Sequence, residues 1–166
     1  CIISSVNGNK YCVRDRNKLH LAADRLATIN NRMNKLVIHV GKKYPNKENV
    51  KRLINGYNPK EIYETLPTSE YTAYSENKGE KLAFCLDTKK NNEGKLIDIN
   101  TLMYVALHEL SHVASKSIGH TDEFWDNFKF LITESKEIGI YQPVDYKNTH
   151  TQYCGMTITD NPYYDH

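Results

Sequence analysis

The stretch that decides the fold and suggests the chemistry is VALHELSHVASKSIGHTDEFW, residues 105–125. It holds three of the seven histidines, His108, His112 and His120, with Glu109 directly after the first of them. On a helix, His108 and His112 would lie about 6 Å apart along the axis, with both side chains on one face. Two imidazoles placed in this way can bind one tetrahedral Zn²⁺.

The remaining residues of this stretch could complete a hydrolytic zinc site. Glu109 can lie beside the metal without binding it and accept a proton from the metal-bound water. A catalytic zinc needs a third protein ligand, and we expect His120, because Gly119 allows the chain to turn back toward the helix. Glu123, on the following helix, is the alternative third ligand.

Histidines at this spacing also occur on ordinary surface helices, where water solvates them. The pattern H-E-x-x-H arises by chance in a chain of this length with a probability of about one or two per cent. Here it lies within the apolar run LMYVALHELSHVA, where two histidines and a glutamate are costly to bury unless something satisfies them. This context favours a metal site over a solvated helix.

The composition indicates one folded domain spanning residues 1–166. Hydrophobic residues make up 39% and charged residues 25%, and no linker divides the chain. The formal net charge of +2 neither indicates nor excludes nucleic acid, and the basic cluster GKKYPNKENVKR is expected to be a solvated face. No run approaches the roughly 18 apolar residues of a membrane span. The chain opens on Cys1, which is compatible with an upstream anchor or signal that has been removed.

In the first half of the chain, the hydrophobic pattern predicts two helices and a hairpin. A turn or short hairpin is expected at NGNKY, within residues 1–12. Apolar residues at three- and four-residue steps predict a helix over residues 16–43, and a short helix is expected over residues 47–54. EYTAYSENKGEKLAFCLDT predicts strands over residues 71–75 and 81–87, joined by a turn that contains glycine.

In the second half, helices are predicted over residues 99–118 and 121–138. Asn100 or Thr101 is the expected N-cap of the first helix, and Gly119 is its expected end. The tyrosine-rich tail that follows has no clear periodicity. The second strand of the hairpin, residues 81–87, could be an edge that pairs with a substrate backbone, or simply a strand of the core.

The four cysteines, Cys1, Cys12, Cys85 and Cys154, do not form a C-x-x-C pair. The sequence leaves open whether they are free buried thiols or form one or two disulfides. Disulfides would imply an oxidising compartment or the surface of a virus particle.

Polar residues downstream of the helices are further candidates for the site. Tyr146, His150 and Tyr153 could each donate a hydrogen bond to the oxyanion that forms during hydrolysis. The sequence CGM could form a turn that puts Met156 beneath the metal, although an ordinary glycine turn is expected there. Phe124 is expected to pack in the core.

The motifs resemble those of a known family. HELSH followed by GHTDEFW is similar to the pattern of the WLM-domain and SprT/Spartan metalloproteases, in which H-E-x-x-H is followed by His and then by x-x-x-[FW]. NKGEKLAFCL ahead of LIDINTLMYVALHELSHV is similar to the WLM layout, in which a hairpin strand precedes the active-site helix. Over residues 57–162 the chain most resembles the WLM-like metallopeptidases of large DNA viruses.

This resemblance implies a zincin-like α+β single domain, in which a small antiparallel sheet packs on an active-site helix with additional helices around it. It implies a zinc metalloendopeptidase with one catalytic Zn²⁺, held by His108, His112 and His120, and with Glu109 as the general base. A protein or peptide is then the expected substrate. In the cellular WLM pattern the third histidine comes six residues after the second, whereas here it comes eight residues after, so the loop VASKSIG is two residues longer.

The resemblance leaves two other functions and several locations open. The domain could be a zinc-bound but inactive structural part of a virus particle, or a DNA-associated protease that repairs protein crosslinks, as cellular members do. Viral proteins of this type often look as if an N-terminal hydrophobic anchor precedes the domain. This favours a virion, membrane-associated or extracytoplasmic location over a cytosolic or nuclear one.

Overall fold

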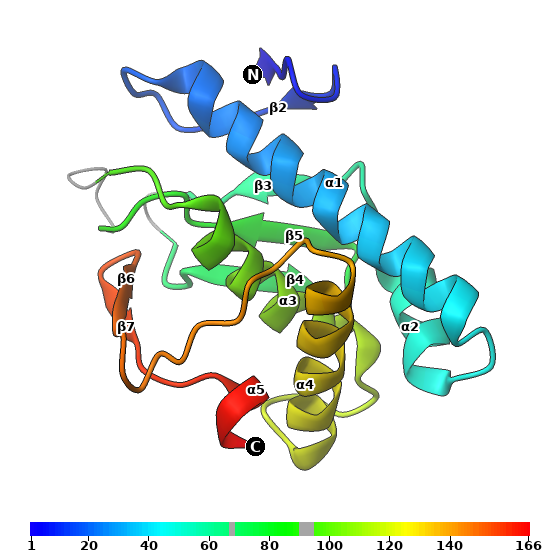
Figure 1. Ribbon diagram of the computed structural model, residues 1–166. Coiled ribbons are helices and arrows are strands. Elements are labelled where there is room, and N and C mark those ends of the chain that lie inside the picture. Colours follow the sequence, from blue (N-terminus) through cyan, green and yellow to red (C-terminus); the bar gives the residue numbers. More distant parts are fainter. Residues whose placement is uncertain (67–68, 90–94) are drawn as a thin grey trace.

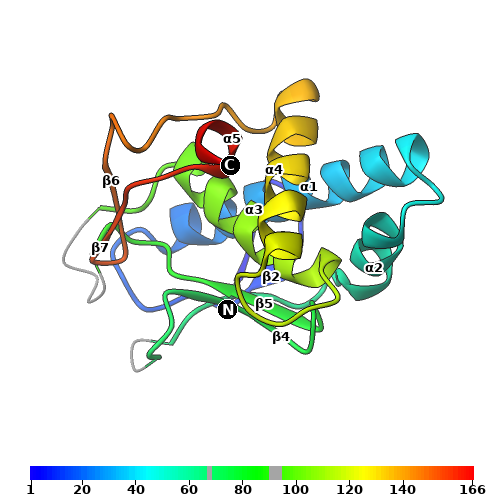
Figure 2. The ribbon, with the colours of Figure 1, turned by 90° about the horizontal axis from the view of Figure 1, so that it is seen from below.

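The computed structural model describes residues 1–66, 69–89 and 95–166. In this part of the chain, helices pack on one face of a small sheet (Figure 1 and Figure 2), and a short hairpin lies near each end of the chain. The helices are α1 (Leu19–Lys43), α2 (Glu48–Gly56), α3 (Ile99–Ala114), α4 (Asp122–Glu137) and α5 (Pro162–Asp165). The strands are β1 (Ile2–Ile3), β2 (Lys10–Tyr11), β3 (Ile62–Glu64), β4 (Ala73–Glu76), β5 (Lys81–Phe84), β6 (Thr151–Tyr153) and β7 (Met156–Ile158).

The central sheet has the strand order β3-β5-β4. Strands β4 and β5 pair antiparallel, which confirms the predicted hairpin. The sheet is nevertheless mixed rather than antiparallel, because β3 pairs parallel to β5, with Ile62 opposite Leu82. The hairpin folds so that β5, its second strand, lies beside β3. The possible edge role of residues 81–87 is therefore wrong, since β5 is the middle strand and β4 lies at the edge.

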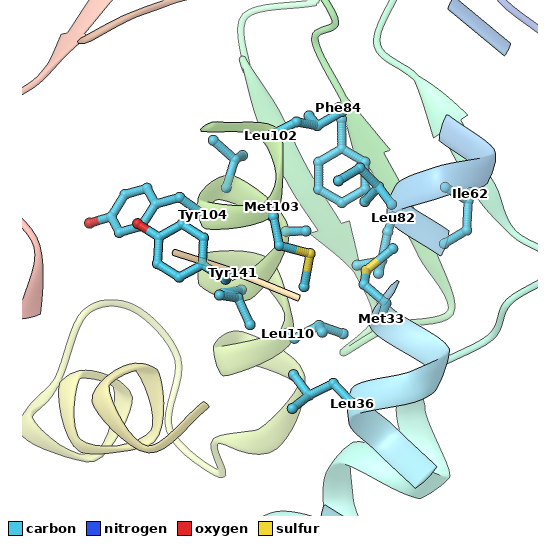
Figure 3. Packing of buried hydrophobic residues seen from close by; sticks show 14 of the residues in the cluster. Met33, Leu36, Ile62, Leu82, Phe84, Leu102, Met103, Tyr104, Leu110 and Tyr141 are labelled. Carbon is cyan, nitrogen blue, oxygen red and sulfur yellow. The ribbon is translucent and has the colours of Figure 1, made fainter. Parts of the chain in front are cut away.

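Helix α3 occupies the centre of the molecule. It contacts α1, α2, α4, β4 and β5, and Figure 2 shows it lying between the sheet and α4. Apolar side chains from all of these layers form one hydrophobic core. Met33 of α1, Met103 of α3 and Phe84 of β5 belong to this core (Figure 3). Most residues of α3 are buried, so packing on several sides fixes the position of this helix.

Helix α3 begins at Ile99 as predicted, but its N-cap and its C-terminal end differ from the prediction. Its N-cap is Asp98 rather than Asn100 or Thr101, and the Asp98 carboxylate accepts hydrogen bonds from the Thr101 backbone N–H at 2.9 Å and from its hydroxyl at 2.7 Å. The helix ends at Ala114, because Ser115 adopts an extended conformation with ψ of 140°. The expected end at Gly119 is wrong, and residues 115–120 form a loop before α4.

The other predicted helices are confirmed with small shifts. Helix α1 begins three residues later than residue 16, and α2 extends to Gly56. Thr121 caps α4 by accepting a hydrogen bond from the Phe124 N–H. In the tail, β6 and β7 form a hairpin whose turn holds Cys154 and Gly155 at positive φ, which confirms an ordinary turn there. Among the described residues, no helix is both long enough and apolar enough to cross a membrane.

All four cysteines are paired in disulfides, which decides between the two alternatives left open by the sequence. Cys1 is bonded to Cys12, which closes the β1–β2 hairpin. Cys85 is bonded to Cys154, across a separation of 69 residues, and joins the end of β5 to the β6–β7 hairpin. Each terminal hairpin is thus held in part by a covalent bond.

Candidate metal centre

Three histidines meet beside the last turns of α3. His108 and His112 lie on successive turns of this helix, and His120 comes from the loop between α3 and α4. The centroids of the three rings are 5.1, 5.0 and 5.1 Å apart, so they form a nearly equilateral triangle. One ring nitrogen of each histidine lies within 4.8 Å of the other two. Three donors grouped in this way can bind one cation.

The ring of Phe124 lies against all three imidazoles. Its centroid is 5.0 Å from that of His108, 4.4 Å from that of His112 and 4.7 Å from that of His120. Phe124 is in the first turn of α4 and is fully buried, as expected for a core residue. The docking of α4 therefore orients all three histidine side chains at once.

Glu109 is buried beside the histidines. Its side chain lines the same pocket, yet the residue is only 5% exposed, and its Oε2 atom lies 3.9 Å from Nε2 of His108. Within the described residues its carboxylate accepts no hydrogen bond. Burial raises the pKa of Glu109 to about 8. A buried carboxyl group that accepts no hydrogen bond fits a position next to a cation or a bound water.

The two histidines of α3 are held in the neutral form that binds metals. Burial, and then the neighbouring His112 and His120, lower the pKa of His108 to about 3. Burial, followed by His120 and Lys78, lowers the pKa of His112 to about 4. A neutral imidazole offers a free lone pair. With three nitrogen donors and a nearby carboxylate, this set of residues fits a catalytic Zn²⁺.

Lys78 holds the loop that carries His120. It lies in the turn between β4 and β5, and its Nζ donates hydrogen bonds to the carbonyl oxygens of His112 at 3.0 Å, Ser115 at 3.0 Å and Ser117 at 2.7 Å. These carbonyls belong to the last turn of α3 and to the loop after it. The ammonium group thus donates hydrogen bonds to backbone carbonyl groups that have no partner within the helix, at the point where α3 stops four residues earlier than predicted.

Glu123 holds the same loop from the other side. Its carboxylate accepts hydrogen bonds from the Ser117 hydroxyl at 2.6 Å and from the backbone N–H groups of Lys116 and Ser117, both at 2.8 Å. These bonds lower the pKa of Glu123 to about 2. Arg52 lies 3.4 Å from this carboxylate and also donates to the Ala114 carbonyl. The carboxylate of Glu123, the alternative third ligand, is therefore bound by the loop and is not grouped with the histidine nitrogens.

The three candidate oxyanion donors lie outside the histidine pocket, although Tyr153 is close enough to Glu109 for an electrostatic interaction. Tyr146 is buried and its hydroxyl lies 3.2 Å from that of Tyr141, whereas the Tyr153 hydroxyl donates to the Thr72 carbonyl at 3.1 Å. His150 is exposed just before β6. None of the three lines the pocket that contains the histidines.

The pocket itself has a volume of about 1140 Å³. Its walls are formed by the edge strand β4, by α3 around His108 and by the loop at residues 118–120. Among the described strands, none pairs with the outer edge of β4. The sequence did not predict that Lys78 and the residues preceding β4 line this pocket, because no local pattern marks them as site residues.

A second group of possible ligands lies between α1 and α4. It consists of His39, Glu134 and Glu137. The ammonium group of Lys43 lies 3.2 Å from the carboxylate of Glu134 and 2.7 Å from that of Glu137. Lys43 already supplies a cation to these carboxylates, so this group is an ion-pair network that links α1 to α4.

Comparison with known proteins identifies viral relatives. The chain is 33% identical over 162 residues to the uncharacterized protein R325 of Acanthamoeba polyphaga mimivirus, and the match covers 95% of this chain and 81% of that protein. Over 61 residues it is 34% identical to the uncharacterized protein 136R of Invertebrate iridescent virus 6, a match covering 37% of this chain and 34% of that protein. Over 58 residues it is 41% identical to the uncharacterized protein 042R of Invertebrate iridescent virus 3, covering 35% and 36%.

These relatives confirm the expected likeness to proteins of large DNA viruses. No protein-family model and no solved structure matches the chain. The likeness to WLM-domain proteases therefore rests on the motifs.

Proposed function

The chain belongs to the same family as the mimivirus protein R325, and we propose that it is a zinc-dependent peptidase of the H-E-x-x-H type. The observation that carries this proposal is the triangle of His108, His112 and His120 in one pocket with the buried carboxyl group of Glu109. A solvated surface helix would not explain why the histidines converge from two segments, or why Glu109 is buried.

In the proposed reaction, His108, His112 and His120 hold the metal and Glu109 moves the proton. Bound zinc would supply a Lewis acid and a water of lowered pKa. Glu109 takes the proton from the attacking water and passes it to the nitrogen of the leaving amine. Its burial suits this role, because a carboxyl group without hydrogen-bond donors keeps a proton more readily than a solvated one.

The edge strand β4 is the proposed guide for the substrate backbone. Its outer edge has no partner among the described strands, and four residues of β4 line the pocket, Ala73, Tyr74, Ser75 and Glu76. An extended peptide could pair with this edge and pass the histidines. Pairing with the substrate backbone, which the sequence analysis considered for residues 81–87, is thus proposed for the neighbouring strand β4.

Two measurements test the proposed function. We expect about one zinc per chain in the purified protein, and the loss of most of it in His108→Ala. Glu109→Gln should keep the zinc and lose hydrolysis of unfolded protein substrates by about a thousandfold or more, since it removes the proton acceptor. Glu80→Gln is the matched control, because this carboxylate is exposed and lies outside the pocket.

The absence of stoichiometric zinc, or full hydrolysis by Glu109→Gln, would refute the proposal. Zinc without hydrolysis would instead favour a zinc-bound but inactive domain, such as a structural part of a virus particle. Assays with and without DNA separate a general peptidase from one that repairs DNA-protein crosslinks, which DNA should stimulate.

We further propose that the protein acts in an oxidising compartment or at the surface of the particle. The two disulfides, Cys1–Cys12 and Cys85–Cys154, support this location. Mass spectrometry of protein taken from infected cells or virions under thiol-blocking conditions tests it. Free thiols at all four cysteines would contradict this location.

A further inference from the structure

Large apolar side chains gather around the histidine pocket. Three of the four most exposed large apolar side chains among the described residues line it: Ile118 is 89% exposed, Leu66 is 69% exposed and Tyr71 is 57% exposed. The fourth, Ile3, lies in the N-terminal hairpin. Single exposed apolar residues are ordinary on a protein surface, but their concentration at one pocket marks a binding site. We call Leu66, Tyr71 and Ile118 the apolar rim.

The residue at one end of the apolar rim is held in place by its neighbours. Ile118 follows Ser117, whose carbonyl accepts from Lys78 and whose N–H donates to Glu123. These hydrogen bonds hold the loop backbone next to Ile118, whose side chain is exposed. It lies two residues before His120, beside the proposed scissile bond.

The other part of the apolar rim precedes β4. The residue before Leu66, Thr65, is tied to the sheet by its N–H, which donates to the Phe84 carbonyl at 3.0 Å. The ring of Tyr71 lies 6.0 Å from that of Tyr74 in β4. Both parts of the apolar rim are thus attached to elements that form the walls of the pocket.

We propose that the apolar rim binds large apolar side chains of an extended peptide next to the scissile bond. This proposal rests on the proposed peptidase function. Such side chains are buried in folded proteins, so the enzyme would select unfolded or loosely folded polypeptides. The peptide is favoured as the occupant because the apolar rim continues into the pocket that holds the histidines and the free edge of β4.

Other occupants fit the surface less well. The exposed carboxylates of Glu70 and Glu76 line the same pocket, and they would repel an anionic membrane or nucleic acid. A second copy of the chain needs about 800 Å² of contact on each partner, which is far more than three side chains around a hollow provide.

Peptide binding to zinc-loaded Glu109→Gln tests the apolar rim without requiring turnover. Two fluorescently labelled peptides of equal length and charge are compared by anisotropy, one with leucine and phenylalanine at its centre and the other with serine at these positions. We expect the apolar peptide to bind at least tenfold more tightly. Adding Ile118→Ser or Leu66→Ser should remove most of this difference. Ile38→Ser, an exposed apolar site on α1 outside the pocket, should leave it unchanged.

Equal binding of the two peptides, no binding of either, or a preference untouched by the Ile118→Ser and Leu66→Ser variants would overturn the role of the apolar rim. The zinc content and hydrolysis of the unmodified protein are separate measurements, so this failure is distinguishable from failure of the peptidase function. Sedimentation of the same variants tests self-association. A dimer that dissociates on Ile118→Ser would also overturn the proposal.

Discussion

The stability of the metal-free protein should pass through a maximum near pH 6.5, and Glu109 sets its alkaline side. Burial raises the pKa of Glu109 in the folded protein to about 8, from a usual value of 4.5. Its stabilising contribution is complete below the unfolded pKa and is lost as the pH rises toward the folded pKa. In this window, each pH unit removes about 1.4 kcal/mol. Between pH 6.5 and 8 the free energy of unfolding should therefore fall by about 2 kcal/mol.

The histidines set the acidic side of the same curve. Burial and neighbouring imidazoles lower the pKa of His108 to about 3 and that of His112 to about 4, from 6.5. Their contribution is present above pH 6.5 and is lost as the pH falls. In this range the unfolded protein binds two more protons at the histidines, so each pH unit of acidification lowers the free energy of unfolding by about 2.7 kcal/mol. The folded protein binds one more proton at Glu109, which offsets about 1.4 kcal/mol of this loss. The net loss is about 1.4 kcal/mol per pH unit below pH 6.5.

Urea unfolding at a series of pH values measures this curve, with a chelator present and the disulfides intact. Glu109→Gln should flatten the alkaline side and leave the acidic loss, because glutamine does not titrate. The exposed Glu76→Gln variant should keep the full curve. The reasoning is refuted if Glu109→Gln still loses about 2 kcal/mol between pH 6.5 and 8.

Two further substitutions test how the loop and the hairpin turn are held. Lys78→Met removes three hydrogen bonds to the end of α3 and its loop, so zinc affinity should fall by about ten- to a hundredfold in competition with a chelator. The exposed Lys116→Met should change it little, and equal affinities would exclude the positioning role of Lys78. Gly79→Ala would place a Cβ atom 2.5 Å from the Gly56 carbonyl oxygen, so it should lower the free energy of unfolding by about 1–3 kcal/mol more than Gly8→Ala. Gly8 also has a positive φ but has open space around it, so equal losses in urea unfolding would contradict this close contact.

The features that the sequence predicted are those encoded over short distances. Periodic apolar residues located α1, α3 and α4, and the ENKGE turn located the β4–β5 hairpin. The spacing of His108 and His112 placed them on one helical face, and a glycine before His120 indicated the return of the chain. The structure brings these three histidines together as the pattern predicts.

The features that were missed depend on contacts between distant segments. Helix α3 stops at Ala114, where Lys78, more than thirty residues earlier in the chain, donates a hydrogen bond to a carbonyl group of its last turn. The parallel pairing of β3 and the disulfide between Cys85 and Cys154 likewise join segments with no local signal. Glu123 is the alternative metal ligand because it lies on the following helix, but no local pattern predicts the loop amides that bind it.

The loop between α3 and α4 also has a consequence for the order in which the molecule assembles. His108 and His112 come together as soon as α3 forms, because local helix formation is fast. His120 can join them only after the β4–β5 turn and α4 have docked, since Lys78 and Glu123 fix its loop. Early folding species would therefore hold a metal through two ligands and exchange it readily. Tight metal retention would mark the final step of folding, so a cobalt absorption band could be used to time when the tertiary structure is complete.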